Sequence, residues 1–284
     1  MAETTLRELL ARPEPVLAPG AYDALSARLA EQAGFGAVYM TGFGASASLL
    51  GRPDAGLMSF GEMVDQARRI VQAVGVPVIA DADDGYGSPL NVIRTVREYE
   101  AAGVAALHIE DQVAPKRCGH LAGKQVIPAG EMVEKVRAAV EARSSLLVIA
   151  RTDARAVEGL EAALERARRY REAGADVLFV EAPEDEAEVE AVAAAFPDTP
   201  LLFNWADGGR TPPLGLERIR ELGFSLVLFP LTALFAATRA VRESLAALRS
   251  RRTPDLAGAL VFDEFTSLIG LPELQRLEDR YTAS

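Results

Sequence analysis

The chain has 284 residues, of which 49% are hydrophobic, and its 41 aspartates and glutamates outnumber its 30 lysines and arginines, which gives a formal net charge of −11. This negative charge argues against nucleic acid or an anionic membrane surface as a partner, and the hydrophobic content excludes a disordered chain. We expect small-molecule partners and a core large enough for one large domain or two modest ones.

The sequence shows neither a membrane span nor a signal peptide. The longest strongly apolar stretch, near residues 226–237, is interrupted by Pro230 and is shorter than the roughly 20 residues that a span needs. Residues 1–10 carry charges where a signal peptide has an apolar run. Cys118 is the single cysteine and so forms no intramolecular disulfide. These features predict a cytoplasmic protein.

Eight short apolar runs, each followed by polar residues or glycine, alternate with helical stretches along the chain. The predicted strands are residues 16–18, 37–40, 76–80, 106–109, 146–150, 177–180, 201–203 and 226–229. Helices are expected between them, for example at residues 60–74, 89–102 and 158–173, with Gly103 and Gly174 closing the last two. Strands that alternate with helices pair in parallel, and eight such units predict a (β/α)8 barrel rather than an open doubly wound sheet.

No break in composition indicates a second domain. We therefore expect residues 1–284 to form a single barrel domain, in which residues 245–284 are a C-terminal helical extension. The apolar and charged tail at residues 262–281 exceeds what an eight-unit barrel requires. An exposed apolar tail predicts packing against another subunit.

Three acidic residues follow the third and fourth predicted strands: Asp81, Asp83 and Glu110. The carboxyl ends of barrel strands share one rim, so these side chains can present oxygen ligands to one hard cation. Mg2+ usually takes one or two carboxylates and keeps several waters, so we expect Asp83 to bind directly and the other two through water. Asp83-Asp84-Gly85 alone is typical of an acidic surface turn, but the preceding strand and Glu110 favour the metal site.

The segment Lys116-Arg117-Cys118-Gly119-His120 places the thiol among two cations and an imidazole. Cationic surroundings lower the pKa of a thiol, which can then donate or accept a proton near neutral pH, and cations can hold a substrate carboxylate. An inert core cysteine is the alternative, weakened by the charged neighbours. A nucleophilic Cys118 with His120 also stays open, although adjacent loop residues seldom have that geometry.

Arg151, Glu181 and Asn204 each close a different predicted strand and together form a candidate clamp for a carboxylate. The alternative is that buried Arg and Glu residues at strand ends pair with each other and serve the structure. His108 lies inside the fourth strand, and we expect it to be a satisfied core residue or to support the site from behind rather than to act in catalysis.

Residues 42–47, Gly-Phe-Gly-Ala-Ser-Ala, match the dinucleotide fingerprint G-x-G-x-x-G/A superficially. The acidic residue that should follow a second strand about 20 residues later is missing. The backbone amides of such a glycine turn can equally bind a carboxylate.

Three segments together resemble the isocitrate lyase/phosphoenolpyruvate mutase superfamily. They are Asp-Ala-Asp-Asp-Gly-Tyr-Gly at residues 81–87, His-Ile-Glu-Asp-Gln at 108–112 and Lys-Arg-Cys-Gly-His at 116–120. The resemblance spans about residues 6–281 and implies a barrel with a Mg2+ site that can also accept Mn2+, and a mobile gating loop. It further implies a homotetramer, a dimer of dimers, whose subunits exchange a C-terminal helix. Lys-Arg-Cys-Gly-His is similar to the signature of the carbon–carbon lyases, which ranks them above phosphonomutases and oxaloacetate decarboxylases.

The resemblance also implies roles for individual residues. It implies that Asp81 and Asp83 serve Mg2+, with Asp54 and Glu110 in the outer shell. It implies substrate contacts for Thr41, Gly42, Phe43, Gly119, Arg151, Glu181 and Asn204. It implies a catalytic set of Cys118, Tyr39, Lys116, Arg117 and His120. In this scheme Tyr39 takes the hydroxyl proton of the substrate, and Cys118 protonates the leaving carbanion.

The implied reaction is cleavage of a 2-hydroxy di- or tricarboxylate, similar to 2,3-dimethylmalate or 2-methylisocitrate, into a 2-keto acid such as pyruvate and a second carboxylic acid. Methylisocitrate lyases carry C-terminal arginines for the third carboxylate, but here Phe235 and residues 262–265 stand near those positions. Residues 204–212 and 268–271 look more like the dimethylmalate lyase, oxaloacetate hydrolase and petal-death-protein branch, although Asp207 replaces the usual Glu. Arg210 or Arg239 could substitute for the missing arginines.

Four alternatives remain at this stage. An oxaloacetate hydrolase or a phosphonomutase-type enzyme would share the barrel and the metal. A barrel that binds a dicarboxylate without turnover, or a nucleotide-binding oxidoreductase on an open sheet, would belong to different functional classes.

Overall fold

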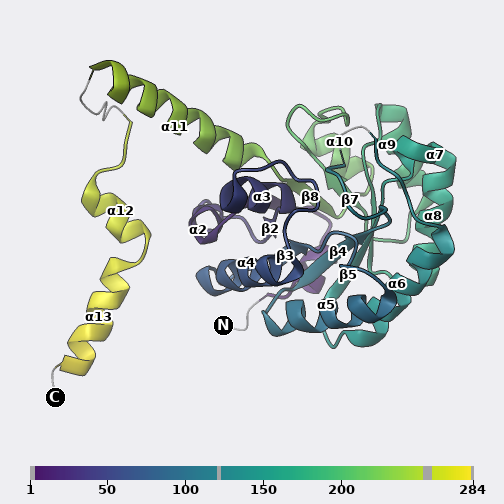
Figure 1. Ribbon diagram of the computed structural model, residues 1–284, viewed down its shortest axis with the longest axis horizontal. Coiled ribbons are helices and arrows are strands. Elements are labelled where there is room, and N and C mark those ends of the chain that lie inside the picture. The colour runs from purple at the N-terminus through teal and green to yellow at the C-terminus, as the bar shows by residue number, and fades with distance from the viewer. Residues whose placement is uncertain (1–3, 120–122, 252–257, 283–284) are drawn as a thin grey trace. The chain divides into compact units, whose positions relative to one another are not determined.

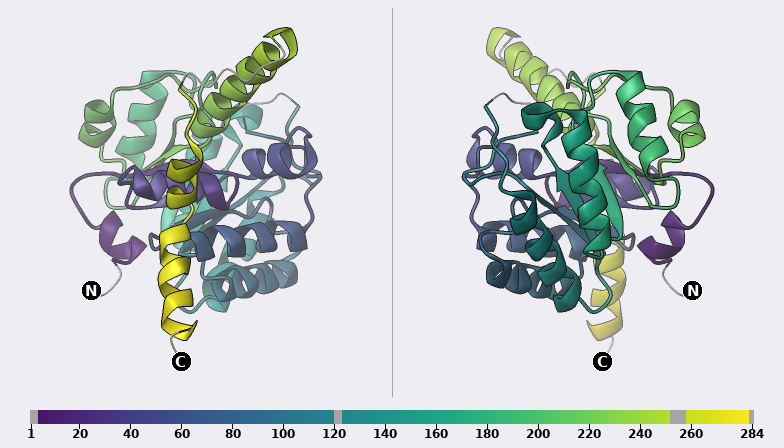
Figure 2. Two further views of the ribbon diagram at one scale, coloured as in Figure 1. Left: turned by 90° about the vertical axis from the view of Figure 1, so that its left-hand side faces the viewer. Right: turned by 90° about the vertical axis from the view of Figure 1, so that its right-hand side faces the viewer.

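The computed structural model describes residues 4–119, 123–251 and 258–282, and its first 234 residues contain a ring of eight parallel strands enclosed by helices (Figures 1 and 2). The strands are β1 (Val16–Ala21), β2 (Val38–Met40), β3 (Val78–Asp81), β4 (Ala106–Glu110), β5 (Leu147–Thr152), β6 (Val177–Val180), β7 (Leu202–Asn204) and β8 (Leu226–Phe229). Each of them overlaps one of the predicted runs, and the predicted (β/α)8 barrel is confirmed.

Helices follow the strands along the chain, and the local sequence sets where several of them begin and end. The helices of this part are α1 (Leu6–Leu10), α2 (Ala24–Gln32), α3 (Gly42–Leu50), α4 (Phe60–Ala73), α5 (Pro89–Ala101), α6 (Ala129–Ala142), α7 (Arg155–Glu158), α8 (Leu160–Glu172), α9 (Glu186–Ala195) and α10 (Leu216–Glu221). At the start of α4, Ser59 and Glu62 cap each other's backbone N–H groups, as their spacing predicts. Gly103 and Gly174 follow α5 and α8 with φ angles of 90° and 105°, a conformation that glycine adopts without strain.

The ring of strands closes between β6 and β7. Seven neighbouring pairs are joined in the order β6-β5-β4-β3-β2-β1-β8-β7, and an isolated parallel bridge between Leu178 and Leu201 joins the two ends. The carboxyl ends of all eight strands therefore meet at one rim.

Alternate residues of each strand belong to two separate hydrophobic clusters. Ile79, Ile149 and Phe179 are among the residues of the smaller cluster, which we infer to be the interior of the barrel. Their strand neighbours, such as Ala80 and Val148, belong to the larger cluster, which includes many helix residues and lies between strands and helices. Because successive strand side chains point to opposite faces, both faces of each strand are buried, which explains the continuous apolar runs.

The same alternation directs the predicted site residues into the barrel interior, in the layer of side chains nearest the carboxyl rim. Asp81, Arg151 and Glu181 each come two residues after an interior side chain, and Glu110 comes two residues after the buried His108. Side chains two apart on a strand point to the same face. Four strands thus direct charged groups into one space at the carboxyl rim.

The chain divides into two compact units, residues 1–234 and 235–284. The second unit includes most of α11 (Thr232–Arg251), together with α12 (Phe262–Leu268) and α13 (Leu271–Thr282). Several of its large apolar side chains, including Phe262, Leu274 and Tyr281, are more than half exposed. The expectation of a single domain with an extension from residue 245 stays a prediction. No helix in the described part of the chain has both the length and the apolarity of a membrane span.

Gly42, at the start of α3, lies against Asp81 at the end of β3. Its backbone N–H donates to Asp81 Oδ2 at 3.2 Å, and a Cβ atom at this position would lie well inside van der Waals contact of that oxygen. Only glycine lets the start of α3 come this close to the rim.

We expect Gly42→Ala to lower the free energy of unfolding by about 1–3 kcal/mol, because the added methyl group forces Asp81 or the helix to move. Gly61→Ala is the matched control, since Gly61 also lies in the first turn of a helix but has open space where a Cβ atom would be added. That change should be neutral or stabilise by up to about 1 kcal/mol. Urea unfolding of both variants measures the difference, and equal stabilities would contradict the steric argument.

Candidate active site

Four acidic side chains lie together where β3 and β4 reach the rim. Asp81 and Glu110 are the last residues of these strands, Asp83 follows in the next turn, and Asp54 comes from the loop after α3. Asp81 Oδ1 accepts the Asp83 N–H at 3.0 Å, and the Glu110 N–H donates to the Asp83 carbonyl oxygen at 2.9 Å. All four are buried, and the Asp83 backbone has a positive φ of 47°.

The ammonium group of Lys116 lies between two of these carboxylates. Its Nζ atom is 2.7 Å from Asp54 Oδ1 and 2.7 Å from Asp83 Oδ1, and the lysine side chain is only 5% exposed. Burial lowers the pKa of Lys116, but the carboxylates of Asp83, Asp81 and Asp54 outweigh it and hold that pKa well above its usual value. A positive charge of the chain itself therefore lies among the predicted metal ligands.

The donor set also suits Mg2+. Carboxylate oxygens are the hard ligands that Mg2+ prefers, and Asp83 Oδ1 and both oxygens of Glu110 are buried without a hydrogen bond, although each carboxylate faces a cation. Within residues 4–119, 123–251 and 258–282, no three Asp, Glu, His or Cys side chains are placed to ligate one ion directly. Because Mg2+ commonly takes one or two protein ligands and waters, the residues fit an ion held by few direct contacts.

Burial and neighbouring charges separate the pKa values of these carboxyl groups. Burial raises the pKa of Asp83 to about 7, with a further rise from Asp81 and Asp54 and an opposing effect of Lys116. Burial likewise raises the pKa of Glu110 well above its usual value, against the opposing charge of Arg151. For Asp81 the positive groups outweigh burial and hold the pKa at about 2. These three carboxyl groups therefore differ widely in how readily they ionise, although they lie at one place on the rim.

Arg151, near the end of β5, links the acidic cluster to the next two strands. Its guanidinium group donates twice to Asp153, at 3.0 and 3.1 Å, and lies 3.0 Å from Glu110 and 3.6 Å from Glu181. Asn204 at the end of β7 donates to Glu181 at 3.2 Å. The structure therefore brings Arg151, Glu181 and Asn204 together, and it shows the Arg–Glu pairing that the sequence left open.

The segment Lys116–Gly119 lies against this group of charges. A Cβ atom on Gly119 would overlap Glu181 Oε1 and Arg151 Nη2, so the backbone itself reaches the rim. Cys118 is half-buried, and its N–H donates to the Asp54 carbonyl oxygen at 3.3 Å. Catalytic roles were also predicted for Arg117 and His120: the Arg117 backbone is anchored by hydrogen bonds, while His120 lies outside the described residues.

Tyr39, in β2, contacts a histidine for which we predicted no catalytic role. Tyr39 Oη is 2.9 Å from His108 Nε2, and both side chains are buried. Burial raises the pKa of Tyr39 well above its usual value, with a further rise from Asp81, and burial lowers the pKa of His108 to about 4, against the effect of Asp81. At neutral pH the pair is a neutral phenol hydrogen-bonded to a neutral imidazole.

The predicted substrate contacts at residues 41–43 lie at the start of α3. Thr41 is the N-cap of this helix, and its hydroxyl accepts the Gly44 N–H at 3.3 Å. The Gly42 N–H is used by Asp81, and Phe43 is half-buried. This turn therefore lies beside the acidic cluster, and one of its backbone N–H groups, that of Gly42, already binds a protein carboxylate.

Asp111 and Asp153 form a buried network behind the rim to which the sequence assigned no role. Asp111 accepts hydrogen bonds from Thr152 Oγ1 at 2.7 Å, Tyr170 Oη at 2.7 Å, the Asp153 N–H at 2.9 Å and Arg166 at 3.2 Å. Burial raises its pKa, and these hydrogen bonds oppose the rise. Both aspartates follow predicted strands, so the sequence could place them at the rim. It could not identify the partners of Asp111 on α8.

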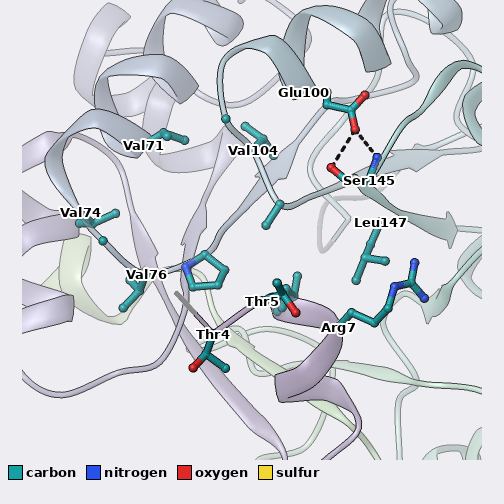
Figure 3. A pocket seen from close by; sticks show the side chains of 15 residues that line it. Thr4, Thr5, Arg7, Val71, Val74, Val76, Glu100, Val104, Ser145 and Leu147 are labelled. Atoms are coloured by element: carbon teal, nitrogen blue, oxygen red, sulfur yellow. Dashed lines mark hydrogen bonds between the residues drawn. The ribbon is translucent and has the colours of Figure 1, made fainter. Parts of the chain in front are cut away.

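A cavity of about 510 Å³ opens at the opposite end of the barrel (Figure 3). Its lining includes Val76, Val104 and Ser145, which precede β3, β4 and β5. Its main acidic group, Glu100, accepts hydrogen bonds from Ser145 and from the backbone N–H groups of residues 144–146. The pocket therefore lacks the convergent charges of the carboxyl rim, and we place the chemistry at the rim.

Comparison with known proteins adds to this geometry. The phosphoenolpyruvate phosphomutase family model matches residues 6–249. The chain is 46% identical to 2,3-dimethylmalate lyase of Eubacterium barkeri over 282 residues, covering 97% of this chain and 96% of that protein. It is 44% identical to 2-methylisocitrate lyase of Aeropyrum pernix over 273 residues, covering 95% and 88%.

Solved structures agree over nearly the whole chain. An oxaloacetate acetylhydrolase in complex with the inhibitor 3,3-difluorooxalacetate is 38% identical, with a TM-score of 0.95, covering 99% of this chain and 97% of that one. A phosphonopyruvate hydrolase in complex with oxalate and Mg2+ is 32% identical, with a TM-score of 0.86 and 98% coverage of both chains.

We expect Asp111→Asn to lower the free energy of unfolding by about 3 kcal/mol, because it weakens several buried hydrogen bonds and removes the more buried of the two carboxylates that pair with the Arg166 guanidinium group, the other being Glu158. Adding Arg166→Met should recover part of that loss, since it removes a guanidinium charge whose remaining partner, Glu158, is exposed. Asp185→Asn is the control: Asp185 caps α9 at the surface, and asparagine caps equally well. Urea unfolding tests the set, and a double variant no more stable than Asp111→Asn would argue against the network.

Proposed function

The chain belongs to the phosphoenolpyruvate phosphomutase family, and we propose that it is a Mg2+-dependent carbon–carbon lyase. Its substrate is a 2-hydroxy di- or tricarboxylate, similar to 2,3-dimethylmalate or 2-methylisocitrate, and its products are a 2-keto acid such as pyruvate and a second carboxylic acid. The observation that carries this proposal is the position of Cys118. Its N–H donates to the carbonyl oxygen of Asp54, so the residue that carries the thiol lies beside the acidic cluster, and the next residue, Gly119, lies against Arg151 and Glu181.

The acidic cluster is the proposed metal site. Asp81 and Asp83 would hold Mg2+, or Mn2+ in its place, with Asp54 and Glu110 in the outer shell. Bound there, the ion would neutralise and polarise the oxygens on which negative charge develops. The Mg2+ in the complex of phosphonopyruvate hydrolase supports this assignment.

The substrate carboxylates are oriented by cationic and backbone groups at the rim. Arg151 and the loop cations Lys116 and Arg117 provide charge, and planar guanidinium groups suit carboxylates. Thr41, Gly42, Phe43, Gly119, Glu181 and Asn204 complete the proposed substrate contacts. His120 remains part of the proposed catalytic set.

The reaction begins with loss of the proton from the 2-hydroxyl group. As that oxygen becomes a carbonyl, the neighbouring carbon–carbon bond breaks, and its electron pair stays with the departing fragment as an enediolate. Tyr39 is the proposed proton acceptor. Because burial keeps its phenol protonated, this role requires its own proton to leave towards His108 Nε2, which is 2.9 Å away. Cys118 then gives its proton to the carbanion.

A dicarboxylate is favoured over a tricarboxylate. The arginines that hold a third carboxylate in methylisocitrate lyases are missing from their usual positions, and the two substitutes suggested by the sequence are engaged at the surface. Arg210 lies 3.1 Å from Glu184, and Arg239 lies 2.8 Å from Glu243. Exposed ion pairs of this kind contribute about 0–1 kcal/mol. Either arginine could therefore leave its glutamate at little cost to bind a substrate carboxylate. Hydrolysis of oxaloacetate is the second candidate, favoured by the similarity to oxaloacetate acetylhydrolase.

We further propose a cytoplasmic homotetramer whose subunits exchange C-terminal helices. The support is the row of exposed apolar side chains on α12 and α13, among them Phe262 and Leu274. Leu274, Leu277 and Tyr281 are spaced three or four residues apart and so share one face of α13, and an apolar face left exposed is typical of an interface.

Keto-acid release from a substrate panel, with and without Mg2+, tests the proposal. The panel is 2,3-dimethylmalate, 2-methylisocitrate, isocitrate and oxaloacetate, the last followed also for oxalate. We expect Mg2+-dependent cleavage of 2,3-dimethylmalate. Cleavage of methylisocitrate would show that another cation holds its third carboxylate, oxalate release alone would favour the hydrolase, and inactivity on all four would contradict the lyase assignment.

We expect Cys118→Ser to lower kcat by at least about 100-fold, the lower limit for loss of a general acid, while the fold and Mg2+ binding remain. Asp83→Ala is the complementary variant: it should lose activation by Mg2+ but keep a Cys118 that reacts with iodoacetamide. Turnover by Cys118→Ser close to that of the original protein would exclude Cys118 as the proton donor.

A further inference from the structure

The segment Lys116–Gly119 is held by two side chains that lie outside it. Beyond the end of β4, Gln112 pairs with Val126 in an isolated antiparallel bridge, so the chain leaves the rim and returns to it at one place. Gln112 comes from the outgoing side, and Lys124 comes from the returning side. Each bonds to the backbone of the segment that carries Cys118.

Gln112 binds both backbone groups of Arg117. Its Nε2 atom donates to the Arg117 carbonyl oxygen at 2.8 Å, and its Oε1 atom accepts the Arg117 N–H at 2.9 Å. Gln112 is only 1% exposed. The amide of glutamine supplies a donor and an acceptor side by side at any pH, so Gln112 satisfies both backbone groups of Arg117 at once.

Lys124 binds the other end of the segment. Its ammonium group donates to the Gly119 carbonyl oxygen and lies 2.8 Å from Asp153 Oδ1. The lysine side chain is 2% exposed and that of Asp153 is 0% exposed. Because Asp153 also accepts two hydrogen bonds from Arg151, Lys124 connects the segment to the charges of the rim.

We propose that Gln112 and Lys124 are positioning residues that fix where Cys118 lies relative to the rim. Cys118 is the residue between the two anchored ones, Arg117 and Gly119, so its backbone cannot shift without breaking one of these contacts. The proposal rests on the proposed function, in which Cys118 donates a proton to the substrate fragment. Neither residue touches the reacting atoms, and both act through the backbone on either side of Cys118.

The test compares Gln112→Met and Lys124→Met with two matched controls. Gln66→Met removes a buried glutamine that donates to the Tyr22 carbonyl oxygen, and Lys135→Met removes a buried lysine that donates to the Asp84 carbonyl oxygen at 3.0 Å. Both controls lose a buried side-chain bond to the backbone, but not in the segment of Cys118. Lys124→Arg is the conservative variant, which keeps a cation for Asp153.

The first measurement is the rate and pH profile of iodoacetamide alkylation of Cys118 in the full-length protein, which requires no substrate. We expect Cys118 to be alkylated about tenfold faster in Gln112→Met, the factor that matches loss of two ordinary hydrogen bonds. In Lys124→Met the increase should be at least as large, because the two lost bonds come from a charged ammonium group. The pH at which the alkylation rate is half its maximum should shift in both variants. Lys124→Arg should return towards the original rate. In the two controls the alkylation rate of Cys118 should stay within about twofold of the rate in the original protein. This should hold even if their melting temperatures fall as much as those of the test variants, because a change in global stability alone leaves the native segment in place.

The second measurement is kcat and KM on whichever substrate the panel identifies. We expect kcat of the two test variants to fall about tenfold with KM nearly unchanged, since misplaced proton donors affect the chemical step more than binding. Alkylation rates that match those of the controls would overturn the positioning role. Faster alkylation with unchanged kcat would support positioning and would instead count against Cys118 as the proton donor. If Gln112→Met fails to fold, Lys124→Met and Lys124→Arg decide the question.

Discussion

The carboxyl rim depends on the sharing of one buried guanidinium group, that of Arg151, among Glu110, Asp153 and Glu181. These acidic groups come from the ends of β4, β5 and β6, and all three are buried, so each depends on the guanidinium group as a nearby partner. Removing one partner of a buried pair commonly costs about 3–5 kcal/mol. The charges that form the candidate site therefore also tie three neighbouring strands together, so stability and chemistry cannot be varied independently here.

Much of this rim could be predicted from the sequence, because strand side chains alternate with a period of two. Once β4 is recognised, Glu110 must share the face of His108, and Asp111 must point the other way. The sequence could not identify what Asp111 meets there. Its partners Arg166 and Tyr170 lie on α8, more than 50 residues further along the chain, and pairing a helix face with a strand end requires the packed structure.

The position of Lys116 was beyond sequence reasoning for a different reason. Its charge predicts contact with a carboxylate, but whether that carboxylate belongs to a substrate or to the protein depends on the path of a loop without strand or helix periodicity. In the structure the partners are Asp54 and Asp83. The ammonium group of Lys116 thus offsets the repulsion between the carboxylates of Asp54 and Asp83. A divalent cation bound to Asp83 would lie close to this positive charge and be repelled by it.

Gly119 shows how the rim also constrains the loop. Unlike Gly123, it has no left-handed φ, so backbone freedom does not explain a glycine here. The explanation is steric, because any side chain would overlap Glu181 and Arg151. Glycine lets the backbone approach these charges directly, and the adjacent thiol of Cys118 is carried with it. Glycine is therefore required at position 119 because of the charged residues at the ends of β5 and β6. These residues lie some 30 to 60 positions further along the chain.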